Sequence, residues 1–212
     1  MKIIFCLPGM TFSKRFLKSW TELIKYIEEK TDIEWELISK YSPIIHKVRQ
    51  QSVSEAINKD YDYIMWIDSD IIFTPADFER LLSHDVDIVS GIYLVKSGDD
   101  IQQLESNYAC IGMNSQKIKK WEIDRYIEVG ENIPIQYNFN TDGPSGLIEV
   151  KGNGMGWMLI KKGVFEKIDN PFDSKISIHE DLSFQVKALE KGFKSYIDPS
   201  IKVGHEKSLI LR

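Results

Sequence analysis

Two carboxylates stand one residue apart in an otherwise apolar stretch. Asp68 and Asp70 occur within IMWIDSDIIF, residues 64–73. In an extended chain, residues two apart point to the same side, so both carboxylates could face one point at the end of a strand. Carboxylates that close together repel each other unless one is protonated or a cation lies between them. Because oxygen ligands suit hard divalent ions, the pair predicts a Mg²⁺ or Mn²⁺ site that could in turn hold a diphosphate.

The simplest alternative for this stretch is a solvated turn in which Ser69 or Asp70 caps a local bend. The surroundings favour the metal site. The stretch follows the strand-like YIMW, and it precedes TPADFERLL, which begins as a helix with Thr74 as the N-cap and Pro75 at the first helical position. In doubly wound sheets, ligands bind beyond the carboxyl ends of the strands, which is where this pair would lie.

A second pair of acids, Glu180 and Asp181, lies at the start of a predicted helix in SIHEDLSFQVKALEKGF. The helix dipole favours ionised carboxylates at this position. Ser177 and Glu180 fit a capping box, in which Glu180 would only close the helix end. Asp181 is then the stronger candidate for a general base, the alternative being a solvated acid in the first turn.

Glycines alternate in KGNGMGWMLI, at positions 152, 154 and 156. Glycine allows the backbone to approach a ligand closely or to adopt positive φ. The segment is not a dinucleotide fingerprint, because a strand rather than a helix follows it, and a simple bulged turn fits equally well. Trp157 could stack on a sugar, but a single tryptophan more commonly fills the core.

Three further residues carry groups that suit a binding site. His205 follows the last predicted strand and is either a metal ligand or a surface residue. Arg49 and Lys96 are candidates to neutralise phosphate, although most such side chains are simply solvated.

Length and composition are those of one globular domain. The chain has 212 residues, of which 42% are hydrophobic, and a formal net charge of −5, which argues against a general nucleic-acid binder. Its two cysteines, Cys6 and Cys110, are too few for a disulfide framework and favour a reducing, cytoplasmic compartment. No apolar run is long enough to span a membrane, and the opening KIIFCLPG reads as a first strand rather than a signal peptide.

Strands and helices alternate along the first half of the chain, which predicts a parallel sheet with helices on both faces. The predicted strands are 2–7, 33–39, 61–68 and 86–95. A first helix is predicted from the apolar face of Phe16, Trp20, Leu23 and Ile27, and two more are predicted over 44–59 and 74–82. The stretch 97–145 breaks this rhythm, with strand expected only in RYIEV and IPIQYNF.

Order returns after this insertion with a strand, the glycine-rich turn, another strand and a short helix. The last helix is predicted to start near Ile178, with an apolar face of Leu182, Val186 and Leu189, and to end at Gly192. FKSYID and IKVGH are predicted as two closing strands. The fold class is therefore α/β.

Taken in this order, four stretches resemble one family. YDYIMWIDSDIIFTPADFERLL, VSGIYLVK, GNGMGWMLIKKGVFEKI and HEDLSFQVKALEKGFKSYIDPSIKVGHEK are similar to GT-A fold glycosyltransferases of the broad family 2 type. The resemblance is closest to small single-domain members found in phage and bacterial genomes. It implies a GT-A (Rossmann-like), mostly parallel sheet flanked by helices, with a small additional antiparallel sheet. One domain, 1–212, would comprise a nucleotide-binding half (1–96), an insertion (97–146) and an acceptor and catalytic half (147–212).

The resemblance also implies roles for residues. The donor would be a nucleotide-sugar, most often a UDP-sugar, and the metal ion Mn²⁺ or Mg²⁺. Asp68 would lie near the nucleotide and the metal, Asp70 would bind the metal directly, and His205 would complete its shell. The other implied positions are Pro8, Thr11 and Arg49 beside the base and ribose, Ser69 in the nucleotide-binding turn, Gly154, Met155, Gly156 and Trp157 along the donor sugar and acceptor, and Asp181, with Glu180 beside it, as the base of an inverting enzyme.

Two other functions stay open. A Mg²⁺-dependent nucleotidyltransferase uses a related sheet, but it would need a glycine-rich basic loop after the first strand, where LPGMTFSKRF has one glycine. A non-catalytic nucleotide-sugar-binding module would lack turnover altogether. The acceptor, whether a saccharide, a lipid-linked glycan, a protein or a modified DNA base, is not readable from the sequence, and we expect the insertion to select it.

Overall fold

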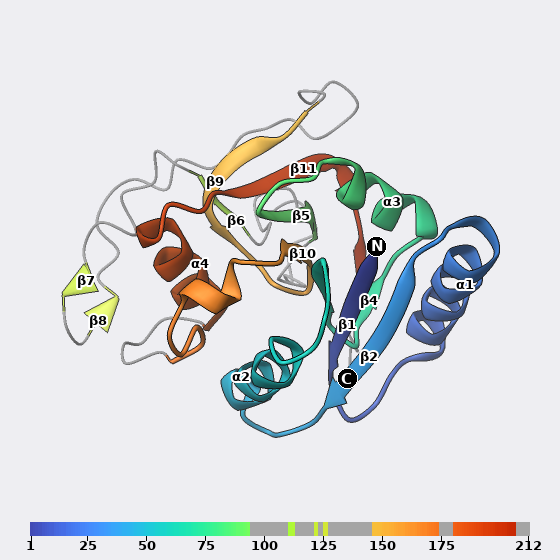
Figure 1. Ribbon diagram of the computed structural model, residues 1–212, viewed down its shortest axis with the longest axis horizontal. Helices are drawn as coiled ribbons and strands as arrows, with labels where there is room; N and C mark the ends of the chain where they lie inside the picture. Colours follow the sequence, from blue (N-terminus) through green and yellow to red (C-terminus); the bar gives the residue numbers. More distant parts are fainter. Residues whose placement is uncertain (94–109, 113–120, 123–124, 127–145, 174–179, 207–212) are drawn as a thin grey trace, which may run out of the picture.

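A mixed sheet lies between two layers of helices in the computed structural model of the chain (Figure 1). The structure describes residues 1–93, 110–112, 121–122, 125–126, 146–173 and 180–206. The strands are β1 (Lys2–Pro8), β2 (Glu34–Lys40), β3 (Tyr63–Ile67), β4 (Ile71–Ile72), β5 (Ile88–Ile92), β6 (Cys110–Gly112), β7 (Trp121–Glu122), β8 (Arg125–Tyr126), β9 (Ile148–Asn153), β10 (Trp157–Lys161), β11 (Ser195–Lys202) and β12 (Gly204–His205). The helices are α1 (Lys14–Lys30), α2 (Ile45–Ala56), α3 (Pro75–Ser83) and α4 (Glu180–Glu190), with a 3₁₀ turn at Phe165–Lys167.

The main sheet has eight strands in the order β2-β1-β3-β10-β5-β11-β9-β6. β10 and β9 run antiparallel to both of their neighbours, and the pairs β1–β2, β1–β3 and β5–β11 are parallel. Two small two-stranded sheets, β12–β4 and β7–β8, complete the described strands. The predicted α/β class, with a mostly parallel central sheet and a small second sheet, is confirmed.

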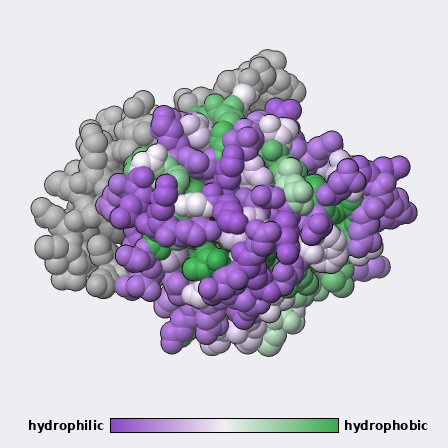
Figure 2. Space-filling view, viewed as in Figure 1, coloured by the Kyte–Doolittle hydropathy of each residue, from purple (hydrophilic) through white to green (hydrophobic). Residues whose placement is uncertain are grey.

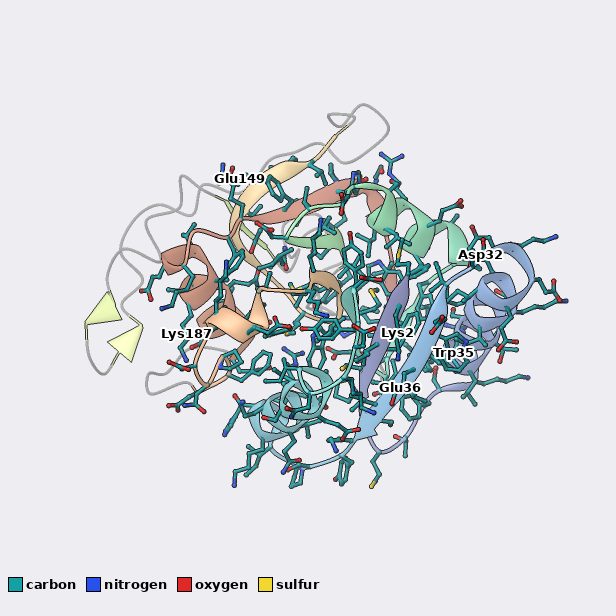
Figure 3. The ribbon with its side chains drawn as sticks, viewed as in Figure 1. Lys2, Asp32, Trp35, Glu36, Glu149 and Lys187 are labelled. Carbon is teal, nitrogen blue, oxygen red and sulfur yellow. The ribbon has the colours of Figure 1, made fainter. Side chains whose placement is uncertain are left out.

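Alternation along the central strands divides the core between the two faces of the sheet. On β1, Phe5 and its alternate neighbours pack with α1 and α3, whereas Ile4 and Cys6 pack with α2 and α4. Trp35 and Glu36, labelled in Figure 3, are neighbours on β2 whose side chains make contacts on opposite faces of the sheet. Trp35 makes edge contacts with Phe5 and with a tryptophan of α1, and Glu36 pairs with a lysine that follows α2.

The helix predicted from TPADFERLL is confirmed as α3. Thr74 and Asp77 form a reciprocal capping box, and Pro75 occupies the first turn, where its missing N–H costs nothing. These signals are local, so no tertiary contact is needed to define this helix end.

The predicted face of the last helix was wrong. α4 buries Phe184 and Ala188 against the α2 side of the core, and the rings of Phe184 and Phe165 stack at 4.7 Å. Leu189, predicted to be apolar core, is 40% exposed. Apolar residues occur on more than one side of this short helix, so the aromatic partners on neighbouring elements decide which side is buried.

The two predicted closing strands are divided differently in the structure: most of the first and the start of the second form β11, and Gly204 and His205 form β12. β11 runs continuously from Ser195 to Lys202, and its register with β5 shifts between Ile197 and Lys202. The Asp198-Pro199-Ser200 sequence looks like a turn but occupies this irregularity within the strand.

Some predictions lie wholly or partly outside the described residues. β8 confirms strand at the start of RYIEV, but IPIQYNF, Lys96 and Ser177 are outside the described ranges. Within those ranges, no helix is long and apolar enough to cross a membrane. The face seen in Figure 2 is mostly hydrophilic, with separate hydrophobic areas.

A buried carboxylate ties α3 to β11 and supports a stability prediction. Asp198 is fully buried and accepts hydrogen bonds from Arg80 Nε at 2.6 Å and from Ser200 N at 2.9 Å, while His84 Nε2 lies 2.8 Å away. Burial alone would raise the pKa of Asp198, but a hydrogen bond from the Ser200 hydroxyl at 2.5 Å, together with those from Arg80 and Ser200 N and the contact with His84, holds it below its ordinary value.

We therefore expect Asp198→Asn to lower the free energy of unfolding by about 2 kcal/mol near neutral pH. A lowered folded-state pKa contributes stability above the unfolded pKa and loses it as the pH falls through the folded value. The difference in melting temperature between wild type and variant should thus shrink in acid. Equal melting temperatures at neutral pH would contradict this role, and the exposed Asp32→Asn is the control.

Candidate functional site

The acidic pair lies in a tight turn at the carboxyl edge of β3. The chain leaves β3 at Ile67, and the N–H of Ile71 donates to the carbonyl of Asp68 at 3.1 Å. The prediction that the chain stays extended through Asp68 and Asp70 was therefore wrong, because this hydrogen bond folds it back into β4. The turn nevertheless places both carboxylates at the predicted edge of the sheet.

Asp70 meets His205 across the small sheet formed by β4 and β12. His205 pairs with Ile71 in this sheet, and the N–H of Glu206 donates to the carbonyl of Asp70 at 2.7 Å. These backbone bonds bring His205 Nε2 to 3.1 Å from Asp70 Oδ2. The structure thus brings together two of the three residues predicted to bind metal.

Asp68 faces a buried arginine instead. Arg49, on α2, is 3% exposed, and its Nη2 lies 3.4 Å from Asp68 Oδ1. Its Nη1 lies 3.0 Å from Glu180 Oε1 at the start of α4. Burial opposes the charge of Arg49, but Asp68, Glu180 and Asp181 outweigh it and raise the pKa of Arg49.

The same environment acts on the aspartate. Burial raises the pKa of Asp68, with Asp70 adding to the effect, while Arg49 acts in the opposite direction. Arg49 therefore joins α2, the acidic turn and α4 within one cluster of charges.

Asp181 lies in the first turn of α4, where its Oδ1 accepts the N–H of Leu182 at 2.8 Å. Gln185 anchors this turn, because its Nε2 donates to the carbonyls of Asp181 at 3.0 Å and Asn153 at 2.6 Å. Its Oε1 accepts the N–H of Asn153 at 3.0 Å. Sequence reasoning missed Asn153 and Gln185, since a glutamine inside a helix carries no signal that it is buried.

The glycine-rich turn contributes backbone rather than side chains. The carbonyl of Gly156 accepts the N–H of Asp68 at 2.9 Å, and a Cβ at Gly156 would lie 3.1 Å from Asp68 Oδ2. The close approach of the Asp68 carboxylate to this backbone therefore favours glycine at position 156. The side chains of Met155 and Trp157 are fully buried, and Trp157 packs on Phe73 with ring centroids 4.5 Å apart. Trp157 is thus a core residue, and contact with a ligand would come from the glycines.

A pocket of about 240 Å³ opens beside the acidic turn. It is lined by Pro8, Gly9, Tyr41, Ser42, Ile45, Val48, Asp68, Ser69 and Asp70. Of the predicted nucleotide contacts, Pro8, Asp68 and Ser69 line it. Thr11 and Arg49 do not: Thr11 is exposed outside it, and Arg49 is buried. Tyr41 and Ser42 were missed, although their place directly after β2 puts them at the same sheet edge and was a usable signal.

Asp70 and His205 could hold a divalent cation if a bound ligand supplied the remaining coordinating atoms. In the described part of the chain, no three His, Cys, Asp or Glu side chains converge on one metal position. Asp70 and His205 offer one carboxylate oxygen and one imidazole nitrogen, which Mn²⁺ accepts. The cluster also holds four carboxylates: Asp68, Glu180 and Asp181 act on the buried Arg49, and Asp70 acts on Asp68. This excess of negative charge favours an additional cation.

Comparison with known proteins identifies the fold. No family model and no curated protein matches the sequence. The structure of A197 from STIV matches with a TM-score of 0.54 and 21% identity over 100% of this chain and 97% of that one. GalNAc-T7, solved with UDP, GalNAc and Mn²⁺, matches with a TM-score of 0.61 and 13% identity over 98% of this chain and 43% of that one.

Glucosyl-3-phosphoglycerate synthase from Mycobacterium tuberculosis, solved with Mn²⁺, UDP-glucose and phosphoglyceric acid, is a third match. Its TM-score is 0.50 and its identity 9%, over 99% of this chain and 73% of that one. The identities are low, so these likenesses concern the fold alone. The chain has a GT-A-like fold, which it shares with these three structures.

Proposed function

We propose that this chain is a metal-dependent glycosyltransferase that transfers a sugar from a nucleotide-sugar, most simply a UDP-sugar, to an acceptor hydroxyl. The observation that carries the proposal is the meeting of Asp70 and His205 beside a pocket lined by the same acidic turn. The fold supports it, because GalNAc-T7 and the mycobacterial synthase, which share it, were solved with UDP or UDP-glucose and Mn²⁺.

The pocket provides the chemistry that a nucleoside requires. Ile45 and Val48 form apolar wall, Tyr41 offers an aromatic ring, and Ser42 offers a hydroxyl. The acidic turn closes one side, so a nucleotide bound here would direct its phosphates towards Asp70.

Asp70 and His205 would hold Mn²⁺ or Mg²⁺, with the remaining ligands coming from the diphosphate and water. When bound, the ion supplies the positive charge that stabilises a diphosphate leaving group. Arg49 orients the carboxylate of Asp68, which lines the pocket together with Ser69. In this position the carboxylate can accept hydrogen bonds from the bound nucleotide-sugar.

Asp181 acts as the general base in this proposal. The acceptor hydroxyl gives its proton to the Asp181 carboxylate, its oxygen bonds to the anomeric carbon, and the bond from that carbon to the diphosphate breaks. A single displacement of this kind inverts the anomeric centre. Glu180 is engaged by Arg49, so it is better suited to orienting the helix than to taking the proton.

The proposal extends to the organisation of the chain. Residues 1–96 would supply the nucleotide site, residues 147–212 would supply the base and the histidine, and 97–146 would select the acceptor. The family 2 type, related to small phage and bacterial enzymes, is supported by the order of the motifs along the chain. The fully buried free thiol of Cys6 is compatible with a reducing, cytoplasmic setting.

Thermal unfolding with nucleotide-sugars tests the proposal directly. At saturating concentration, a UDP-sugar together with Mn²⁺ should raise the melting temperature by about 5 °C, because ligand binding to the native state adds to its stability. UDP-sugar with EDTA should have a much smaller effect. The proposal fails if no nucleotide-sugar shifts unfolding in the presence of Mn²⁺. A shift without any UDP release in the presence of a panel of acceptors would favour the non-catalytic alternative.

A further inference from the structure

Tyr93 contacts two residues that lie beside the acidic turn, Gly156 and His205. It follows β5 directly and is 7% exposed. Its hydroxyl oxygen reaches the glycine-rich turn, and its ring reaches His205. Nothing in its sequence context, GIYLV, indicated a role in the site.

The first contact leads to Asp68. Tyr93 Oη accepts the N–H of Gly156 at 2.9 Å, and the carbonyl of the same Gly156 accepts the N–H of Asp68 at 2.9 Å. A Cβ at Gly156 would lie 2.9 Å from Tyr93 Oη and 3.1 Å from Asp68 Oδ2. Both oxygens thus approach the same side of one glycine, so the position of the phenol helps to define where the Asp68 carboxylate lies.

The second contact leads to Asp70. The ring of Tyr93 meets the imidazole of His205 edge to face, with centroids 5.3 Å apart and an interplanar angle of 79°. Such a contact restricts rotation of the imidazole, whose Nε2 lies 3.1 Å from Asp70 Oδ2.

We propose that Tyr93 is a positioning residue that sets the two aspartates of the turn relative to each other. Asp68 and Asp70 repel each other, and each is held by a different partner. Tyr93 contacts one neighbour of each aspartate. The carbonyl of Gly156 accepts the backbone N–H of Asp68, and His205 lies beside the carboxylate of Asp70. The consequence for transfer rests on the proposed function: Tyr93 would act on donor binding through Asp68 and on metal binding through His205.

Two variants separate these contacts. Tyr93→Phe removes the acceptor of the Gly156 N–H but keeps the ring against His205. We expect it to raise the KM for the donor roughly three- to tenfold, the worth of one hydrogen bond, with a smaller change in kcat. Tyr93→Leu removes the ring as well, so it should also raise the Mn²⁺ concentration needed for half-maximal activity.

Tyr61→Phe is the matched control. Tyr61 is 1% exposed, its hydroxyl donates to Glu166 Oε1 at 2.6 Å, and Lys162 Nζ lies 5.5 Å from the centre of its ring. The same loss of a buried hydroxyl at Tyr61 should lower stability without changing the donor KM. An equal KM change in both variants would show that Tyr93 has only a structural role.

Measurements on the protein alone keep this proposal separate from the proposed function. Hydrogen exchange of the Gly156 amide should accelerate in Tyr93→Phe, and the NMR signals of the His205 imidazole should move in Tyr93→Leu, with neither change in Tyr61→Phe. If the wild type binds no UDP with Mn²⁺, the glycosyltransferase proposal fails, while these two signals still decide the role of Tyr93. Unchanged Gly156 exchange in Tyr93→Phe, or an unmoved His205 in Tyr93→Leu, would overturn it.

Discussion

Replacing Asp70 by asparagine is expected to abolish metal-dependent sugar transfer, lowering turnover about a hundredfold or more. The amide keeps the shape of the side chain but removes the negative charge beside His205 Nε2. Binding of UDP should weaken in Mn²⁺ and become insensitive to EDTA. The side chain of Asp70 is 39% exposed, so the melting temperature of the free protein should change little.

The measurement is the initial rate of UDP release across a Mn²⁺ titration, with UDP binding followed by calorimetry. Asp32→Asn makes the same change in the loop between α1 and β2, at the exposed position labelled in Figure 3. It should leave both quantities unchanged. An Asp70→Asn enzyme that keeps normal Mn²⁺-dependent turnover would show that the metal is held elsewhere.

Asp181→Asn is expected to lower kcat by about two to four orders of magnitude and to leave UDP binding intact. A general base contributes a factor of this size, and an amide cannot take the acceptor proton. Asp181 does not line the proposed nucleotide pocket, so the donor KM should change far less than kcat. The loss of a first-turn acid should cost the helix only about 0.5 kcal/mol.

Glu180→Gln provides the contrast for this variant. Glu180 pairs with Arg49, which also holds Asp68, so its loss should be felt in the donor KM and in stability more than in kcat. The opposite pattern, in which Glu180→Gln removes turnover and Asp181→Asn keeps it, would assign the base to Glu180. Turnover retained in both variants would rule out a base on α4.

The elements that were predicted correctly are those defined by local signals. The capping box of Thr74 and Asp77 closes within one turn, and the strand YIMWI is apolar throughout because both of its faces are covered. The order of such elements was enough to predict a mostly parallel sheet, and hence the edge at which ligands would bind.

The geometry within the site depends on contacts that no local pattern encodes. The turn at Asp68 is set by a hydrogen bond to Ile71, which alternation along a strand does not predict. Arg49 looked like a phosphate ligand, yet two carboxylates from other elements surround it. A lone tyrosine after a strand, as at Tyr93, becomes informative only when Gly156 is brought to it by the reversed strand β10.

The pairing of β4 with β12 also has a consequence for biosynthesis. Among the described residues, all those that line the proposed nucleotide pocket fall between Pro8 and Asp70, but Asp70 and His205 are 135 positions apart. At typical rates of translation, on the order of ten seconds separate the synthesis of these two side chains. The acidic turn is therefore synthesised well before His205. The two proposed cation ligands can come together only after the residues that line the pocket have been made.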